Sequence, residues 1–214
     1  MTQEDVFSIL QEGDAEKMKV LLDASPEKAG SKDANGVSLV LTALYHRKPD
    51  MAALIAGHLP ALSVHEASAL GDESALKHAL EADPDCLNRF ADDGFTPLHL
   101  AGFFGREQAV GVLLDAGADL APHSKNPMQV AAINCATAGR NERCVKLILE
   151  AGADVNTPQQ KGYTPLMSAA SAGSESMVNL LLQAGADTSL VSEDGKTARI
   201  LAEEHGHKHL LDLL

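Results

Sequence analysis

An internal repeat is the feature that most constrains the fold of this chain. The segment GFTPLHLA, from Gly94 to Ala101, recurs as GYTPLMSA from Gly162 to Ala169, and a weaker copy begins at Gly195. A second motif, LLDAGADL at 113–120, recurs as LILEAGADV at 147–155 and as LLLQAGADT at 180–188. Because several positions repeat together at a regular spacing, the pattern predicts a chain built from stacked copies of one supersecondary unit.

Each unit is predicted to contain two short helices. Thr96 is suited to an N-cap, and Pro97 follows at the first helical position, where no backbone donor is needed. Gly105 interrupts this helix after about two turns, and an apolar period of a second helix continues through Leu113. Gly117 then stands where a left-handed C-terminal cap is expected. Helices this short cannot bury an apolar face alone, so neighbouring units must pack together.

These motifs resemble the ankyrin repeat, whose unit reads G-x-T-P-L-H-x-A-A-x-x-G-H, then an apolar helix, then L-L-x-x-G-A-D. The resemblance implies an all-α solenoid of about seven helix-turn-helix units joined by short β-hairpin-like turns, with residues 1–214 as a single domain. The expected units are 2–34, 35–60, 61–91, 92–124, 125–159, 160–192 and 193–214.

Two units depart from the pattern. The third unit lacks the Gly-x-Thr-Pro turn. In the fifth unit, Pro127 to Gly152 spans 25 positions where Pro97 to Gly117 spans 20, which predicts five extra residues around Asn134–Asn141. The connection that enters the fifth unit is correspondingly expected to be three residues short, so both units should have blunted hairpins.

Composition excludes several classes of function. Asp and Glu outnumber Lys and Arg by 30 to 17, so binding to a phosphate backbone lacks its usual electrostatic attraction and no nucleic acid partner is expected. No apolar run approaches the roughly 18 residues of a membrane span, so no membrane association is expected. The odd set Cys86, Cys135 and Cys144 shows no disulfide framework and favours a reducing compartment, for which the cytoplasm is the simplest expectation.

The titratable residues do not suggest an enzyme. The sequence has no nucleophile elbow, phosphate loop or HExxH pair, so neither catalytic residues nor a cofactor are expected. His65 and His99 lie inside the repeat motif, and the resemblance implies that they bond the backbone of neighbouring units. His205, His207 and His209 offer metal ligands, but Gly206-His207 coincides with the Gly-His that opens the family's second helix. We therefore expect a polar turn rather than a metal site.

The resemblance implies instead that a partner meets the hairpin tips and the ends of the first helices, which line a concave groove. Of only seven aromatic residues, five fall at such positions, which suits interface anchors. The predicted contact residues are Tyr45, Asp92, Asp93, Phe95, Phe103, Phe104, Gln160, Lys161 and Tyr163. An alternative is that Phe103 or Phe104 belongs to the core. Arg140, Arg143 and Lys146 form a basic spot that could steer an acidic peptide, although exposed charges are usually not specific.

The function expected from the sequence is a non-enzymatic protein–protein interaction module that binds a partner protein or peptide in its groove. The net charge of −13 favours a neutral or basic partner, and a monomer is expected. One alternative is a regulatory subunit or inhibitor of a cytoplasmic enzyme. Another is a metal-binding protein that uses the C-terminal histidines.

Overall fold

A computed structural model describes residues 5–214, and this part of the chain is entirely helical apart from turns and one isolated β-bridge between Lys32 and Ser38. The predicted all-α ankyrin-type solenoid is confirmed, whereas the seven unit boundaries stay a prediction. Thirteen α-helices and four short 3-10 helices are present in the described residues: α1 (Val6–Glu12), α2 (Ala15–Ala24), η1 (Pro26–Gly30), α3 (Leu39–Tyr45), α4 (Pro49–Ala56), α5 (Val64–Leu70), α6 (Glu73–Ala82), η2 (Pro84–Cys86), α7 (Pro97–Phe103), α8 (Glu107–Asp115), α9 (Ala132–Ala138), α10 (Glu142–Glu150), η3 (Gln160–Gly162), α11 (Pro165–Ser171), α12 (Glu175–Gln183), α13 (Ala198–Glu204) and η4 (Lys208–Leu210).

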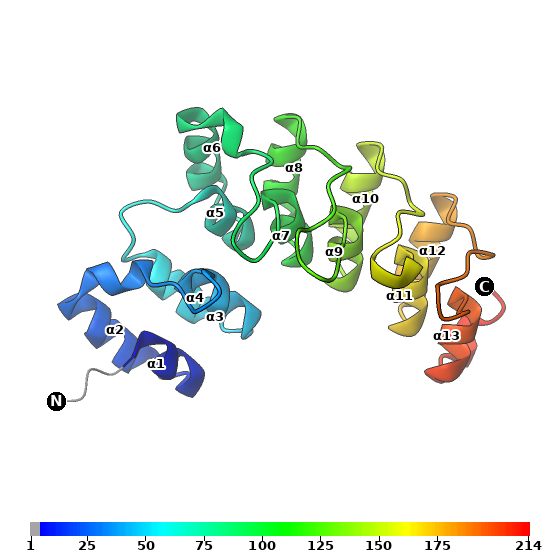
Figure 1. Ribbon diagram of the computed structural model, residues 1–214, viewed down its shortest axis with the longest axis horizontal. Helices are drawn as coiled ribbons and strands as arrows, with labels where there is room; N and C mark the ends of the chain where they lie inside the picture. Colours follow the sequence, from blue (N-terminus) through cyan, green and yellow to red (C-terminus); the bar gives the residue numbers. More distant parts are fainter. Residues whose placement is uncertain (1–4) are drawn as a thin grey trace.

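The helices form an arch of neighbouring pairs (Figure 1). From α1 to α12, each odd-numbered helix packs against the even-numbered helix that follows it, and α5, α7, α9, α11 and α13 pack in succession. In the green part of the arch, α7 and α9 lie on the inner curve beneath α8 and α10 (Figure 1). The helices α7 and α9 therefore lie on the concave side, which is where a groove was expected.

Local sequence signals set most helix ends. Pro97 and Pro165 are the first residues of α7 and α11, as predicted. Thr164 accepts a hydrogen bond of 3.3 Å from the backbone N–H of Met167, which caps α11. The hydroxyl of Thr96 instead lies 2.6 Å from Nδ1 of His99. Gly117 adopts a φ of 85°, which confirms the left-handed position expected after the second helix.

The core is divided between the second and third helix pairs. One apolar cluster combines α1 to α4 with Ala69 and Leu100, and the other extends from Val64 to Leu210. Only residues 57–63 connect α4 to α5, whereas residues 83–96 connect α6 to α7. This confirms the blunted hairpin of the third unit. Because the hairpin is missing, α1 to α4 are set at an angle to the rest of the arch (Figure 1).

The fifth unit corrects the prediction of an insertion around Asn134–Asn141. The helix α9 has seven residues, as do α7 and α11. Its N-cap is Ala131, so Ala132 takes the place of Pro97, and Ala132 to Gly152 spans the usual 20 positions. The sequence suggests Pro127 as the first residue of this helix, because neither Thr nor Pro stands at the true start, Ala131 and Ala132.

The extra residues of the fifth unit lie in its hairpin tip. The Ser124 N–H donates to the carbonyl of Val130 over 2.8 Å, six positions apart, where the Ala91 N–H donates to the carbonyl of Phe95, four positions apart. The tip is therefore two residues longer than its neighbour, and the predicted short, blunted entry to this unit is wrong. No helix within residues 5–214 is long and apolar enough to cross a membrane.

Candidate functional site

The N-terminal helices close against the tip of the fourth unit. Tyr45, the last residue of α3, donates a hydrogen bond of 2.8 Å to Oδ2 of Asp93, and Nζ of Lys32 lies 2.8 Å from Oδ2 of Asp92. The ring of Tyr45 also packs against Phe104, with centroids 5.4 Å apart. Burial raises the pKa of Tyr45, and the adjacent Asp93 carboxylate raises it further. Asp92 and Asp93, which the sequence predicted as partner contacts, are thus paired within the chain.

Beside this closure lies an apolar cleft of about 400 Å³. Three large apolar side chains on its walls are open to solvent, with exposed fractions of 37% for Tyr45, 40% for Phe103 and 50% for Met128. The residues that define this apolar cleft are Tyr45, Phe95, His99, Leu100, Phe103, Met128, Val130, Asn134, Cys135, Ala138 and Gln159. They come from α3, α7, α9 and three successive hairpins, so the cleft lies in the middle part of the arch.

Two backbone features form the walls of the apolar cleft. Gly139 lets the end of α9 approach α7, since a Cβ atom there would lie 2.2 Å from the Phe103 carbonyl oxygen. The longer tip of the fifth hairpin carries Met128, whose carbonyl accepts a 3.0 Å hydrogen bond from the Gln160 N–H of the next hairpin. The cleft therefore depends on a close helix contact and on the two additional tip residues.

The two adjacent phenylalanines occupy different environments. Phe103 is exposed in the apolar cleft, whereas Phe104 packs, partly buried, against the apolar cluster of α1 to α4. Their rings meet edge to face with centroids 5.2 Å apart. The structure thus places Phe103 in the apolar cleft and Phe104 against the core of α1 to α4.

A second hollow, of about 990 Å³, continues from the apolar cleft. Both share Tyr45, Phe103 and Ala138. We call it the basic hollow, and its residues are Leu44, Tyr45, Arg47, Pro49, Phe103, Phe104, Arg106, Ala138, Gly139 and Arg140. Arg106 is partly fixed because its Nε donates to the carbonyl of Ala69 over 2.8 Å. The combined groove is thus apolar at one end and cationic at the other.

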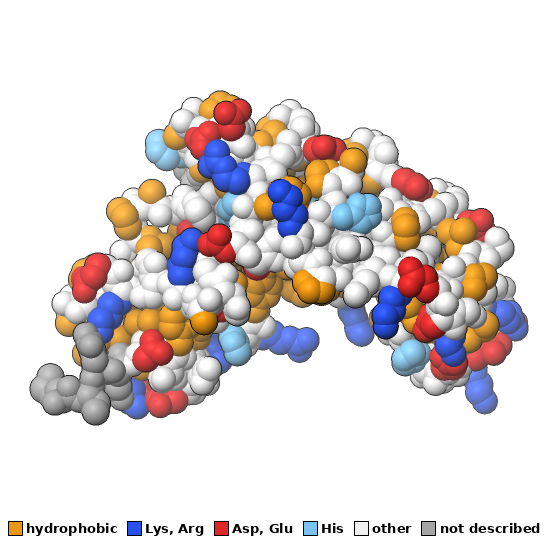
Figure 2. All heavy atoms as spheres, in the orientation of Figure 1, with side chains coloured by type: hydrophobic (Ala, Val, Ile, Leu, Met, Phe, Trp, Pro, Cys, Tyr) orange, Lys and Arg blue, Asp and Glu red, His pale blue; other side chains and the backbone are white. Residues whose placement is uncertain are grey.

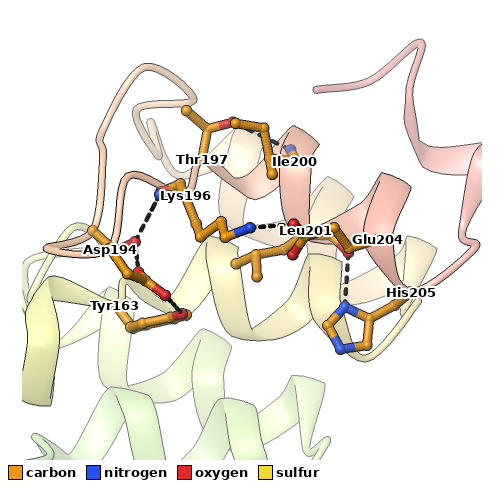
Figure 3. Close-up of polar contacts among 9 residues, drawn as sticks. Tyr163, Asp194, Lys196, Thr197, Ile200, Leu201, Glu204 and His205 are labelled. Atoms are coloured by element: carbon orange, nitrogen blue, oxygen red, sulfur yellow. Dashed lines mark hydrogen bonds and ion pairs between the residues drawn. The ribbon is translucent and has the colours of Figure 1, made fainter.

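The predicted contact residues of the sixth unit are not among those that line either hollow. The Lys161 carbonyl accepts a 2.9 Å hydrogen bond from the Glu193 N–H, which joins this hairpin to the next. The Tyr163 hydroxyl donates to Oδ2 of Asp194 over 2.8 Å (Figure 3). Gln160, Lys161 and Tyr163 therefore tie successive hairpins together in this structure.

Polar side chains near the start of the first helices bond to backbone further along the chain. Nε2 of the buried His99 lies 2.8 Å from the Val130 carbonyl of the next unit, as the resemblance implied. Nε2 of the half-buried His65 lies 2.7 Å from the Arg89 carbonyl, which is within the predicted bounds of its own unit. Asn134 takes this place in the fifth unit, where its Nδ2 donates to the Thr157 carbonyl over 3.1 Å. Burial lowers the pKa of His99 to about 4, so the imidazole is neutral near pH 7.

The C-terminal histidines also bond to backbone. Nδ1 of His205 lies 2.9 Å from the Leu201 carbonyl, and Nε2 of His207 lies 3.0 Å from the Ser171 carbonyl. Residues 5–214 contain no group of three or more His, Cys, Asp or Glu side chains placed to hold a metal ion. All three cysteines are buried and unpaired, and burial raises the pKa of the Cys135 thiol, which lines the apolar cleft.

Sequence reasoning missed several groove residues: Arg47, Arg106, Met128, Val130, Cys135, Ala138 and Gln159. A signal for some of them was present. Val130 to Asn134 reads V-A-A-I-N, which aligns with F-T-P-L-H from Phe95 to His99 once the apolar positions are matched instead of the prolines. That alignment would have assigned Met128 to the hairpin tip and Ala138 to the end of the first helix.

Comparison with known proteins agrees with this architecture. A family model described as ankyrin repeats (3 copies) matches residues 64–159 and 133–214, which together cover well over half of the chain. Among curated relatives, "Ankyrin repeat, SAM and basic leucine zipper domain-containing protein 1" of Colobus guereza is 33% identical over 111 residues, 50% of this chain and 23% of the relative. The protein of the same name from Mus musculus is 34% identical over 106 residues, 48% of this chain and 22% of the relative.

This chain thus spans less than a quarter of the length of these relatives. Ankyrin repeats are generally protein–protein interaction modules, and proteins of the family are typically non-enzymatic scaffolds. The matching residues and the helical solenoid lead to one conclusion: the chain belongs to the ankyrin repeat family.

Proposed function

We propose that this protein is a non-enzymatic module that binds a segment of a partner protein in the groove formed by the apolar cleft and the basic hollow. One observation carries the proposal. Of six large hydrophobic side chains exposed in residues 5–214, three (Tyr45, Phe103 and Met128) converge on one cleft. Exposed apolar side chains that gather in a hollow are typical of an interaction site, whereas single ones are ordinary.

Because the groove is preorganised, a small number of anchor residues would be enough to bind a partner. His99 bonds the Val130 carbonyl and Asn134 bonds the Thr157 carbonyl, so the groove walls are fixed before a partner arrives. Binding then costs little additional ordering entropy, and a few aromatic contacts can supply most of the affinity. The anchors in this proposal are Tyr45, Phe95, Phe103 and Met128. Phe104, Asp92 and Asp93 hold the N-terminal helices in place, and Gln160, Lys161 and Tyr163 hold the hairpins beside the groove.

Several properties of the partner follow from the whole chain. The net charge of −13 favours approach by a protein that is neutral or basic overall. The three free, buried cysteines suit a reducing compartment, so we propose a cytoplasmic location and a monomer that acts without a cofactor. We further propose that the partner is neither nucleic acid nor membrane. The alternative is that the protein regulates an enzyme. This requires the partner to be an enzyme whose activity changes on binding.

Photo-crosslinking in the native host tests the proposal. A benzoylphenylalanine residue in place of Phe103 keeps an aromatic ring in the groove and should capture a discrete partner. The matched control places the same residue at Val20, which is 68% exposed on α2 and lies outside both hollows. Equal capture at both positions, or none at Phe103, would contradict the proposal. An activity assay of a captured enzyme with and without this protein would then decide the regulatory alternative.

A further inference from the structure

Two arginines occupy backbone positions at which the other units use glycine. After the first helix of each pair, one residue adopts a positive φ, and it is glycine in five turns: Gly13, Gly71, Gly105, Gly173 and Gly206. In the two remaining turns it is Arg47 and Arg140, each with a φ of 57°. A side chain with a Cβ atom is strained in this region, which glycine enters readily.

Close packing explains why glycine is kept in some of these turns. Where glycine is kept, a residue of the next unit can lie against it, as Arg106 does at Gly71 and Asn141 at Gly105. At positions 47 and 140 the chain accepts backbone strain that glycine would relieve. Non-glycine residues held at positive φ are concentrated at functional sites, so an outlier of this kind motivates a functional hypothesis.

Both strained arginines face one place, the basic hollow. Arg47 and Arg140 are both exposed and line this hollow together with Phe103 and Arg106. Neither Arg47 nor Arg140 forms an ion pair or a side-chain hydrogen bond within residues 5–214, and no carboxylate of those residues lines the hollow. Figure 2 shows Lys or Arg side chains that reach into the concavity beneath the arch.

This arrangement is unexpected from the overall charge. The chain carries 30 acidic side chains against 17 Lys and Arg, and eight of these cations form an ion pair within residues 5–214, as Lys32 does with Asp92. Arginine binds carboxylates through its planar fork of donors, and two unpaired guanidinium groups beside an apolar cleft form a matched receptor for them.

We propose that the segment bound in the groove is locally acidic: a large apolar side chain fills the apolar cleft, and one or two carboxylates next to it bind Arg47 and Arg140. This inference rests on the proposed function and specifies its partner. The continuity of the two hollows through Tyr45, Phe103 and Ala138 requires the apolar and acidic groups to be close in the partner's sequence. The net charge of this protein governs the partner's approach as a whole, whereas the arginines select the segment that enters the groove.

A selection from a displayed library of random 12-residue peptides tests the proposal with the whole chain as bait. Wild-type protein should enrich peptides in which Phe, Leu, Ile or Met is followed or preceded within about three residues by Asp or Glu. The double variant Arg47→Gly and Arg140→Gly should still enrich the apolar residue but lose the acidic preference. Arg143→Gln is the matched control, because Arg143 lies outside both hollows and should select as the wild type does.

The best selected peptide then gives a quantitative measurement. Replacing its acidic residues by glutamine should weaken binding to wild-type protein at least tenfold at 0.15 M salt, and should change binding to the double glycine variant by less than twofold. The melting temperature of the glycine variant should equal or exceed that of the wild type, since glycine relieves the positive φ. The glutamine peptide tests the charge on unmodified protein, so the result does not depend on how the variant folds.

The outcomes separate the two proposals. Neutral or basic peptides that require Phe103, as shown by a parallel selection on Phe103→Ala, would overturn this inference and leave the proposed function standing. A selection that enriches no peptide, or peptides indifferent to Phe103→Ala, would contradict the proposed function itself. Self-association that the double glycine variant abolishes would assign the groove to a second copy of the chain and would also overturn the inference.

Discussion

The Tyr45 hydroxyl donates a 2.8 Å hydrogen bond to Asp93, which lies 48 residues further along the chain. The two residues belong to the second and fourth units and meet because the third unit has no hairpin between them. This bond, together with the ring contact between Tyr45 and Phe104, fixes one wall of the apolar cleft. The shape of the proposed groove therefore depends on how the N-terminal helices are attached.

Replacement of Tyr45 by phenylalanine should loosen this attachment. The variant retains the ring but loses the bond to Asp93, so we expect the free energy of unfolding to fall by about 1 kcal/mol and the N-terminal amides to exchange faster. Tyr163→Phe is the matched control, because it loses an equivalent 2.8 Å bond to Asp194 outside the groove. Urea denaturation and hydrogen exchange measure both effects. Equal exchange of α1 to α4 in the two variants would contradict this role for Tyr45.

Alanine substitutions should distinguish the two phenylalanines. Phe103→Ala removes a ring that is 40% exposed, so the unfolding free energy should change by less than about 1 kcal/mol. Phe104→Ala leaves a void against the core of α1 to α4 and should cost about 2 kcal/mol or more. Thermal and urea unfolding check the difference. Comparable losses from the two variants would show that Phe103 also supports the core.

Protonation of His99 should destabilise the fold in acid. Burial lowers its pKa from 6.5 to about 4, so the unfolded chain binds the extra proton first as pH falls. The stability due to the neutral imidazole is fully present above pH 6.5 and is lost progressively toward pH 4, up to about 3 kcal/mol. The measurement is urea denaturation between pH 7 and pH 4.

The variant His99→Asn supplies the control for this pH dependence. Asn134 makes the same kind of bridge in the next unit, since it accepts from the Ala131 N–H and donates to the Thr157 carbonyl. An asparagine at position 99 can thus preserve the link without a titrating group, and its stability should fall less between pH 6.5 and pH 4. An unchanged pH profile in His99→Asn would assign the acid sensitivity to other groups.

Alanine substitutions at Gly94 and Gly117 test how the fourth and fifth hairpins pack against each other. A Cβ atom at Gly94 would lie 2.8 Å from the backbone carbon of Lys125, whereas one at Gly117 would meet nothing within 4 Å. Both glycines have a positive φ, so alanine should strain both, but Gly94→Ala must also displace the next hairpin. We expect its unfolding free energy to fall by about 2 kcal/mol more than that of Gly117→Ala. Equal losses would mean that the two hairpins do not stack as described.

Local signals predicted the helices well. Pro97 and Pro165 begin their helices and Gly117 ends the second helix of its unit, because each of these residues has a strong intrinsic backbone preference. The fifth unit was misread because Ala131 and Ala132 carry no such preference, whereas Pro127 lies nearby in the hairpin. An apolar period was the better guide there, since the core requires Ile133 to be buried whatever caps the helix.

The groove could be predicted only in part. Tyr45 and Phe103 were predictable because they are aromatic and lie at the ends of first helices, and both line the apolar cleft. Sequence could not show that Tyr45 meets Asp93 or that Phe104 turns away from Phe103, because both facts depend on the angle between the N-terminal helices and the rest of the arch. That angle is set by the short 57–63 connection, whose conformation no repeat motif encodes.

The central claim is that the exposed ring of Phe103 anchors a partner in the groove. Its most direct test is the dissociation constant of the photo-crosslinked partner for wild-type protein, Phe103→Ala and Val20→Ala. Val20 is more exposed than Phe103 but lies outside the groove, so it controls for the loss of surface apolar area. We expect binding to weaken at least about tenfold in Phe103→Ala and to stay at the wild-type value in Val20→Ala. Wild-type affinity in Phe103→Ala would contradict it.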